Sequence, residues 1–87
     1  MAVQEKYLRL FQHLQVAAEG EEQSLVMPIA EVAELVDDLP PAALTKKQWW
    51  GGSTSAQARA WLSAGWEVQV VGFGQQRVAF RRLPSPP

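Results

Sequence analysis

Apolar side chains recur every three or four positions through the first eighteen residues of the chain. The positions on this stripe are Val3, Tyr7, Leu8, Phe11 and Leu14. Polar residues occupy the opposite side, so the spacing predicts an amphipathic helix over 3–18. Gly20 follows at the point where helices commonly end on a left-handed residue. His13 lies at the edge of the stripe, where we expect a boundary or solvent-exposed side chain rather than a functional one.

A short apolar run and a second amphipathic stretch come next. Residues 24–27 predict a brief strand, which Pro28 confines to a sheet edge because proline cannot donate to the hydrogen-bond ladder. Residues 29–37 place apolar side chains on one face and carboxylates on the other, which predicts a second, short helix. The run 38–41 contains two consecutive prolines and ends this helix, since the residue before a proline disfavours helical geometry.

The segment 41–50 predicts a third helix, which the glycines at 51 and 52 terminate. On a wheel at about 100° per residue, Lys46 lies on the apolar side of this helix. Its apolar neighbours on that side are Ala42, Ala43, Trp49 and Trp50. At least one of the two tryptophans is expected in the core. The other is expected to cover Lys46 by a cation–π contact or, if exposed, to stack on a base or anchor a partner.

The C-terminal half predicts one more helix and a hairpin. Ser53, Thr54 or Ser55 is placed to cap a helix over about 55–64. Residues 66–70 alternate strictly between apolar and polar, which predicts a strand. A turn over 72–76 and a return strand over 78–81 follow. One face of the return strand carries Val78 and Phe80, and the other carries Arg77, Ala79 and Arg81.

The predicted order is helix, short strand, three helices and a hairpin. This order favours an α+β fold in which helices pack on one face of a small antiparallel sheet. It also resembles a winged helix-turn-helix with an additional helix before the wing. We expect a single globular domain over 1–83 and a disordered tail over 84–87.

Composition narrows the class of protein. Cysteine is absent, which excludes disulfides and thiolate metal sites, and the single histidine cannot build a zinc site without several carboxylate ligands. Four tryptophans among 87 residues indicate a core built on aromatic packing. The N-terminus lacks the apolar region of a signal peptide, and no apolar run approaches the roughly 20 residues of a membrane span. We therefore expect a cytoplasmic domain without membrane, metal or cofactor.

No residue pattern points to catalysis. Glu31 and Glu34 are one helical turn apart, but no histidine stands at metal-ligand spacing from either. The serines at 53, 55 and 63 have His13 as one conceivable base, and no motif orients it. The glycines at 72 and 74 lie in the hairpin turn, where no helix follows to bind phosphate. We expect that the protein is not an enzyme.

The charges divide unevenly along the chain. Residues 1–43 carry two cations and eight carboxylates, a balance of −6, and residues 44–87 carry six cations and one carboxylate, a balance of +5. Such an asymmetry indicates a face for a polyanion or an acidic partner, or two halves that attract each other within the fold.

Two functions follow from this asymmetry. The first is a winged-helix module for double-stranded DNA, in which 41–50 is the reading helix. Its expected contacts are Lys46, Lys47, Gln48, Arg59, Arg77 and Arg81. The second is a protein-interaction module, in which the acidic and basic faces or a free sheet edge bind a partner or a second copy.

The run from Leu39 to Phe80 resembles a small bacterial domain family of unknown function. The motifs that carry the resemblance are Leu39-Pro40, Trp49-Trp50, Ala64-Gly65-Trp66 and Val78-Ala79-Phe80. Ala42 and Gly52 stand where the family pattern has a serine and an asparagine. The resemblance implies a winged-helix-like fold and suggests DNA binding.

Overall fold

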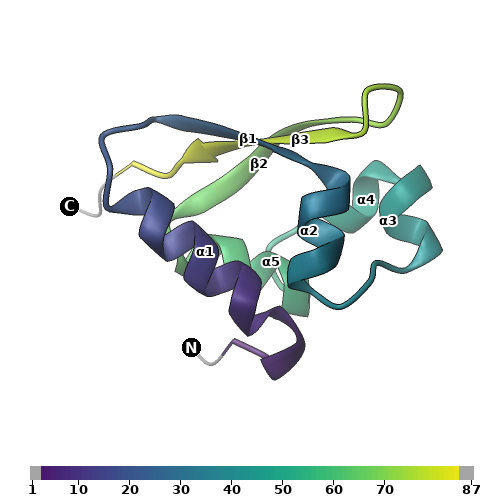
Figure 1. Cartoon of the computed structure of the whole chain (residues 1–87), viewed down its shortest axis with the longest axis horizontal. Coiled ribbons are helices and arrows are strands. Elements are labelled where there is room, and N and C mark those ends of the chain that lie inside the picture. Colours follow the sequence, from purple (N-terminus) through teal and green to yellow (C-terminus); the bar gives the residue numbers. More distant parts are fainter. Residues whose placement is uncertain (1–2, 85–87) are drawn as a thin grey trace.

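The computed structural model describes residues 3–84 as a layer of helices beneath a small antiparallel sheet, whose other face is open (Figure 1). Its elements are the 3-10 turn η1 (Glu5–Tyr7), α1 (Leu8–Ala18), β1 (Ser24–Pro28), α2 (Ile29–Leu35), α3 (Pro41–Thr45), α4 (Lys47–Trp50), α5 (Ala56–Ser63), β2 (Trp66–Gly72) and β3 (Arg77–Arg82). The predicted α+β class is therefore confirmed. Of the predicted tail, only Pro84 lies within the described residues.

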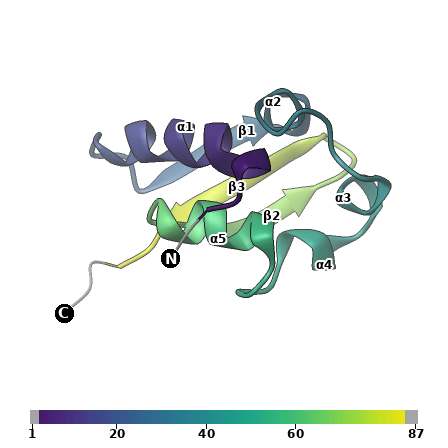
Figure 2. The same cartoon turned by 90° about the horizontal axis from the view of Figure 1, so that it is seen from below.

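The helix layer has two parts. Seen from below, α1 and α5 lie side by side across the sheet, and α2, α3 and α4 gather toward the end where the hairpin turns (Figure 2). The Ser55 hydroxyl accepts a hydrogen bond from the backbone N–H of Ala58 at 3.2 Å, so one of the three predicted capping residues does begin α5.

The strand order is β1-β3-β2, so β3 is central and both of its neighbours are sheet edges. Pro28 is tolerated in β1 because of its register. The backbone N–H of the next residue, Ile29, donates to the Gln76 carbonyl at 2.8 Å. Bonded positions alternate along an antiparallel pair, so the backbone of Pro28 faces away from β3 and its missing N–H removes no ladder bond.

A β-bulge in β2 overrides the alternation that the sequence shows. Strict alternation would place Val70 on the same face as Trp66. The register instead shifts between Val68 and Val70, with Val70 opposite Ala79 and Val71 opposite Val78. Val70 accordingly points to the open face, where it is 54% exposed. Val71 points toward the helix layer, where it is only 7% exposed. The extra residue at Gln69 causes this inversion, because it shifts every later side chain by one position.

The predicted helix 41–50 is two short helices, α3 and α4, which is a correction to the sequence-based expectation. Lys46 between them is extended, with φ −125° and ψ 120°. A continuous helix would direct the Lys46 ammonium toward the apolar side, where burying a charge is costly. The break leaves Lys46 exposed. It also allows the indole N–H of Trp50 to donate to the Ala43 carbonyl at 2.8 Å.

Aromatic side chains form the centre of the core. Trp50 and Trp61 stack with ring centroids 6.0 Å apart, and Phe80 packs on Trp61 at the same distance. The Trp66 indole donates to the Leu14 carbonyl at 2.9 Å, which ties β2 to α1. Trp49 is half-buried, with its ring edge-on to Trp50 at 4.8 Å. Trp50 is therefore the core member of the predicted pair.

Arg82 connects the end of β3 to the end of α1. Its guanidinium donates to the Ala18 carbonyl and, at 3.0 Å, to the Gly20 carbonyl. It also lies 5.4 Å from the Trp66 ring centroid. Within the described residues, the cation–π contact joins Arg82 to Trp66, and Lys46 makes none. The expected cation–π contact between Lys46 and a tryptophan is therefore wrong. A cation at these carbonyls stabilises the negative end of α1.

Candidate functional site

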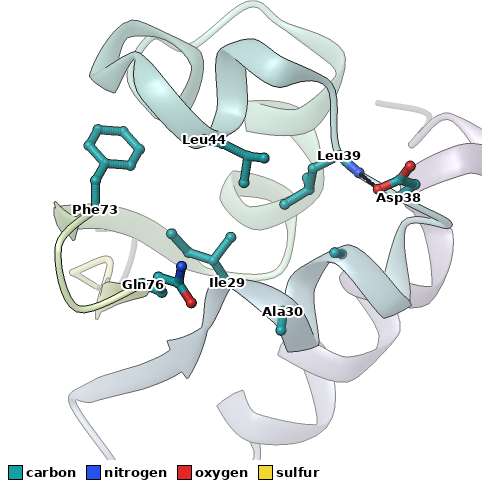
Figure 3. A pocket seen from close by; sticks show the side chains of 8 residues that line it. Ile29, Ala30, Asp38, Leu39, Leu44, Phe73 and Gln76 are labelled. Carbon is teal, nitrogen blue, oxygen red and sulfur yellow. Dashed lines mark hydrogen bonds between the residues drawn. The ribbon is translucent and has the colours of Figure 1, made fainter.

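An apolar cleft of about 270 Å³ opens between α2, α3 and the turn that joins β2 to β3 (Figure 3). The residues that line it are Ile29, Ala30, Ala33, Asp38, Leu39, Leu44, Phe73 and Gln76. Six of these eight side chains are apolar. This cleft was not predictable from the sequence, because its walls come from three segments that only the tertiary structure brings together.

The hairpin turn positions one wall. Gln76 has a left-handed backbone (φ 55°), and its N–H donates to the Phe73 carbonyl at 3.2 Å, which closes the turn. The Gln76 carbonyl also accepts the hydrogen bond from Ile29, so the turn is attached to the start of α2. Phe73 is thereby held at the mouth of the cleft, across from Leu44 on α3 (Figure 3).

The wall opposite the turn carries leucines, whereas the floor on α2 carries alanines. Leu44 is 52% exposed, although it borders Leu39, which is buried. Ala30 and Ala33 lie one turn apart on α2, and their small side chains leave the space open. An apolar surface of this kind is favourable to cover, since buried apolar area contributes about 25 cal/mol per Å².

The acidic turn after α2 holds the single charged group of the cleft. Asp37 and Asp38 both have left-handed backbones, with φ of 58° and 88°. The Asp38 N–H donates to the Ala33 carbonyl at 2.8 Å, which ends α2 in a Schellman-type motif with Asp37 at the position glycine usually occupies. The Asp38 carboxylate accepts the Leu39 N–H at 2.9 Å. Two such residues in succession cost on the order of 1–3 kcal/mol each.

The predicted DNA-contacting residues fall into separate groups. Lys46, Lys47 and Gln48 are all exposed around the start of α4. Lys47 also lines a groove beside Val68–Val71 of β2. Arg77 lies opposite Gly72 in the register, at the same end of the sheet, and projects from the open face. The structure thus places Arg77 at the end of the sheet that α3 and α4 flank (Figure 1).

Arg59 and Arg81 are set apart from that group. Arg59 lies on α5 in the helix layer, whereas Arg81 projects from the open face of the sheet. The Arg81 guanidinium donates to the carboxylate of Glu67, its register partner on β2, with its Nε at 2.9 Å. Arg82, which belongs to the basic half of the sequence, is engaged with α1 as described above.

Possible catalytic and metal-binding groups are sparse in the part of the chain that the structure describes. His13 Nε2 lies 3.6 Å from Glu31 Oε1, and both side chains are partly exposed where α1 meets α2. Residues 3–84 contain no group of three or more histidine, aspartate or glutamate side chains placed to hold a metal ion. None of the helices within these residues has the length and apolar character that crossing a bilayer requires.

Comparison with known proteins identifies a family. The family model described as "Domain of unknown function (DUF7662)" matches residues 8–83. No curated protein and no solved structure matches the chain.

Proposed function

The chain belongs to the DUF7662 family of domains of unknown function, and we propose that it is a non-catalytic protein-interaction module of the bacterial cytoplasm. Its binding site is the cleft between α2, α3 and the hairpin turn. The observation that carries this proposal is the pairing of a half-exposed Leu44 with Phe73 across a floor of alanines. Protein interfaces concentrate their binding energy in a few well-packed pockets from which water is excluded.

The size of the cleft supports a protein segment as its occupant. Small-molecule and cofactor pockets typically measure about 300–1,000 Å³. At about 270 Å³ and open to solvent, the cleft suits one or two aliphatic side chains. Covering the exposed part of Leu44 and docking a partner side chain would each stabilise a complex by on the order of 1–2 kcal/mol.

A selection of random seven-residue peptides displayed on phage tests this proposal, with the whole chain immobilised. Recovered peptides are expected to share an apolar residue and to lose binding to the Leu44→Asp variant. Val16→Asp is the matched control, because Val16 is an exposed aliphatic residue on α1, away from the cleft. Equal binding to wild type and Leu44→Asp, or no enrichment, would contradict the proposal.

Double-stranded DNA is a second candidate partner, favoured by the exposed side chains of Lys46, Lys47 and Gln48 around the start of α4, with Arg77 on the open face near the hairpin turn. In a winged-helix interpretation, the β2–β3 hairpin would be the wing. Helices of five and four residues are short for major-groove reading, so this group would bind mainly to phosphates.

Fluorescence anisotropy of a mixed-sequence duplex at two salt concentrations tests DNA binding. Combining Lys47→Ala with Arg77→Ala is expected to weaken binding and to reduce the salt slope by about 0.9 for each phosphate that the variant no longer neutralises. Arg81→Ala is expected to have less effect, because Arg81 is already paired with Glu67. Unchanged affinity in the double variant would rule this surface out.

A further inference from the structure

The cleft is apolar except at its rim, where one group is charged. Among the eight residues that line it, Asp38 is the only ionised side chain, and Gln76 is the other polar one. The carboxylate is fixed in place because it accepts the Leu39 N–H and because the turn after α2 holds its backbone. The carboxylate lies at one end of the cleft, beyond Leu39 as seen from Leu44 and Phe73 (Figure 3), so an occupant reaches this negative charge with a long side chain that passes over Leu39.

The chain itself leaves this charge available. The ion pairs within residues 3–84 are His13–Glu31 and Glu67–Arg81, so Asp38 takes part in neither. Lys6 lies near the acidic turn, beside a shallow groove that Asp37 and Asp38 also line. Its ammonium donates to the Val36 carbonyl at 3.1 Å instead.

We propose that the cleft binds a peptide segment in which an apolar side chain is flanked by a cation. The apolar side chain enters between Leu44 and Phe73, and an arginine or lysine next to it contacts the Asp38 carboxylate. Charge complementarity selects this occupant, since an acidic neighbour would be repelled by Asp38 and a neutral one would gain no attraction from its carboxylate. This inference rests on the proposed function and names the chemistry of the partner.

The test titrates the whole, isotope-labelled chain with three short peptides and follows backbone amide shifts by NMR. The first is N-acetyl-Arg-Leu-Arg-amide. The second replaces both arginines by citrulline, which has nearly the same shape and no charge. The third replaces the leucine by alanine. A cation on each side of the leucine makes the test independent of chain direction.

The arginine peptide is expected to shift the amides of the cleft and to bind about two- to fivefold more tightly than the citrulline peptide. The alanine peptide is expected to bind at least about tenfold more weakly, because it buries several fewer methyl and methylene groups. Higher salt is expected to reduce the difference between the arginine and citrulline peptides and to leave the difference between leucine and alanine.

Two variants assign the charge effect to Asp38. Asp38→Asn removes the charge, and asparagine tolerates the left-handed backbone there. It is expected to remove the preference for arginine over citrulline. Asp37→Asn is the matched control, because Asp37 has the same backbone region and does not line the cleft. The control is expected to retain most of the preference.

The outcomes separate the two proposals. If the arginine and citrulline peptides bind equally to wild type while the alanine peptide binds more weakly, the charge inference is wrong and the interaction module stands. If Asp38→Asn and Asp37→Asn reduce the preference equally, the assignment to Asp38 is wrong. If no peptide shifts the cleft amides at millimolar concentration, both proposals fail.

Discussion

Replacing Trp50 by phenylalanine tests how α3 and α4 are held together. Trp50 is 1% exposed, stacks on Trp61, and donates its indole N–H to the Ala43 carbonyl. Phenylalanine keeps an aromatic ring for the stack, but it removes the N–H and the smaller ring of the indole. The Ala43 carbonyl then loses its side-chain donor across the break at Lys46, and part of the indole volume is left empty.

The magnitude follows from these two losses. A buried polar group that loses its partner costs about 1–3 kcal/mol. The smaller ring gives up on the order of 1 kcal/mol of apolar burial. The expected loss is about 2–4 kcal/mol in the free energy of unfolding, out of roughly 5–15 kcal/mol for a typical domain. In a domain of this size, each kcal/mol lowers Tm by about 4–8 °C.

The assay is urea and thermal unfolding followed by far-UV circular dichroism, with Trp49→Phe as the matched control. Trp49 is adjacent and half-buried, and its indole N–H donates no hydrogen bond within the described residues. The control is expected to lose less than about 1.5 kcal/mol. Equal losses in the two variants, or a loss below about 1 kcal/mol for Trp50→Phe, would refute the role given to the buried hydrogen bond.

Two further predictions concern other parts of the core. Burial raises the pKa of the Tyr7 phenol above its ordinary value of 10.0. The folded state therefore retains a proton that the unfolded state releases at high pH. The free energy of unfolding is expected to fall as the pH rises above about 10. Urea midpoints at about pH 8 and pH 11 check this, and Tyr7→Phe is expected to lose less stability between them than wild type. For the bulge, Val71→Thr is expected to cost about 1–3 kcal/mol because it buries a hydroxyl, whereas Val70→Thr on the open face is expected to stay within about 0.5 kcal/mol. Thermal unfolding of the pair measures this contrast, and the reverse order would contradict the observed register.

Much of the secondary structure could be predicted from the sequence. The apolar stripe over 3–18, the strand ended by Pro28 and the helix over 55–64 all correspond to observed elements, with boundaries that differ by a few residues. The faces of β3 were also predictable, since Val78 and Phe80 are buried and Arg77 and Arg81 are exposed. These features depend on the period of the backbone, which is 3.6 residues in a helix and two in a strand.

The candidate site was only partly predictable. Lys46, Lys47 and Gln48 are neighbours in the chain, so their common exposure around α4 follows from local sequence. The distribution of the arginines does not, because Arg59 lies in the helix layer and Arg81 is paired with Glu67. A count of charges along the chain cannot separate a free guanidinium from one that a strand partner engages.

The sequence alone determined the amphipathic faces and the order of helices and strands that gives the α+β class, because both depend on periods within a few residues of the chain. The number of tryptophans indicated an aromatic core, but not which rings meet in it. The tertiary structure alone decided the bulge at Gln69, the break at Lys46 and the cleft. The bulge shifts the register so that Val71 of β2 pairs with the buried Val78 of β3. The break allows Trp50 to reach the Ala43 carbonyl while Lys46 remains in solvent. The cleft exists because segments separated by dozens of residues meet around Ile29 and Gln76. The hydrophobic period of a helix or strand does not indicate which distant segments will pack together.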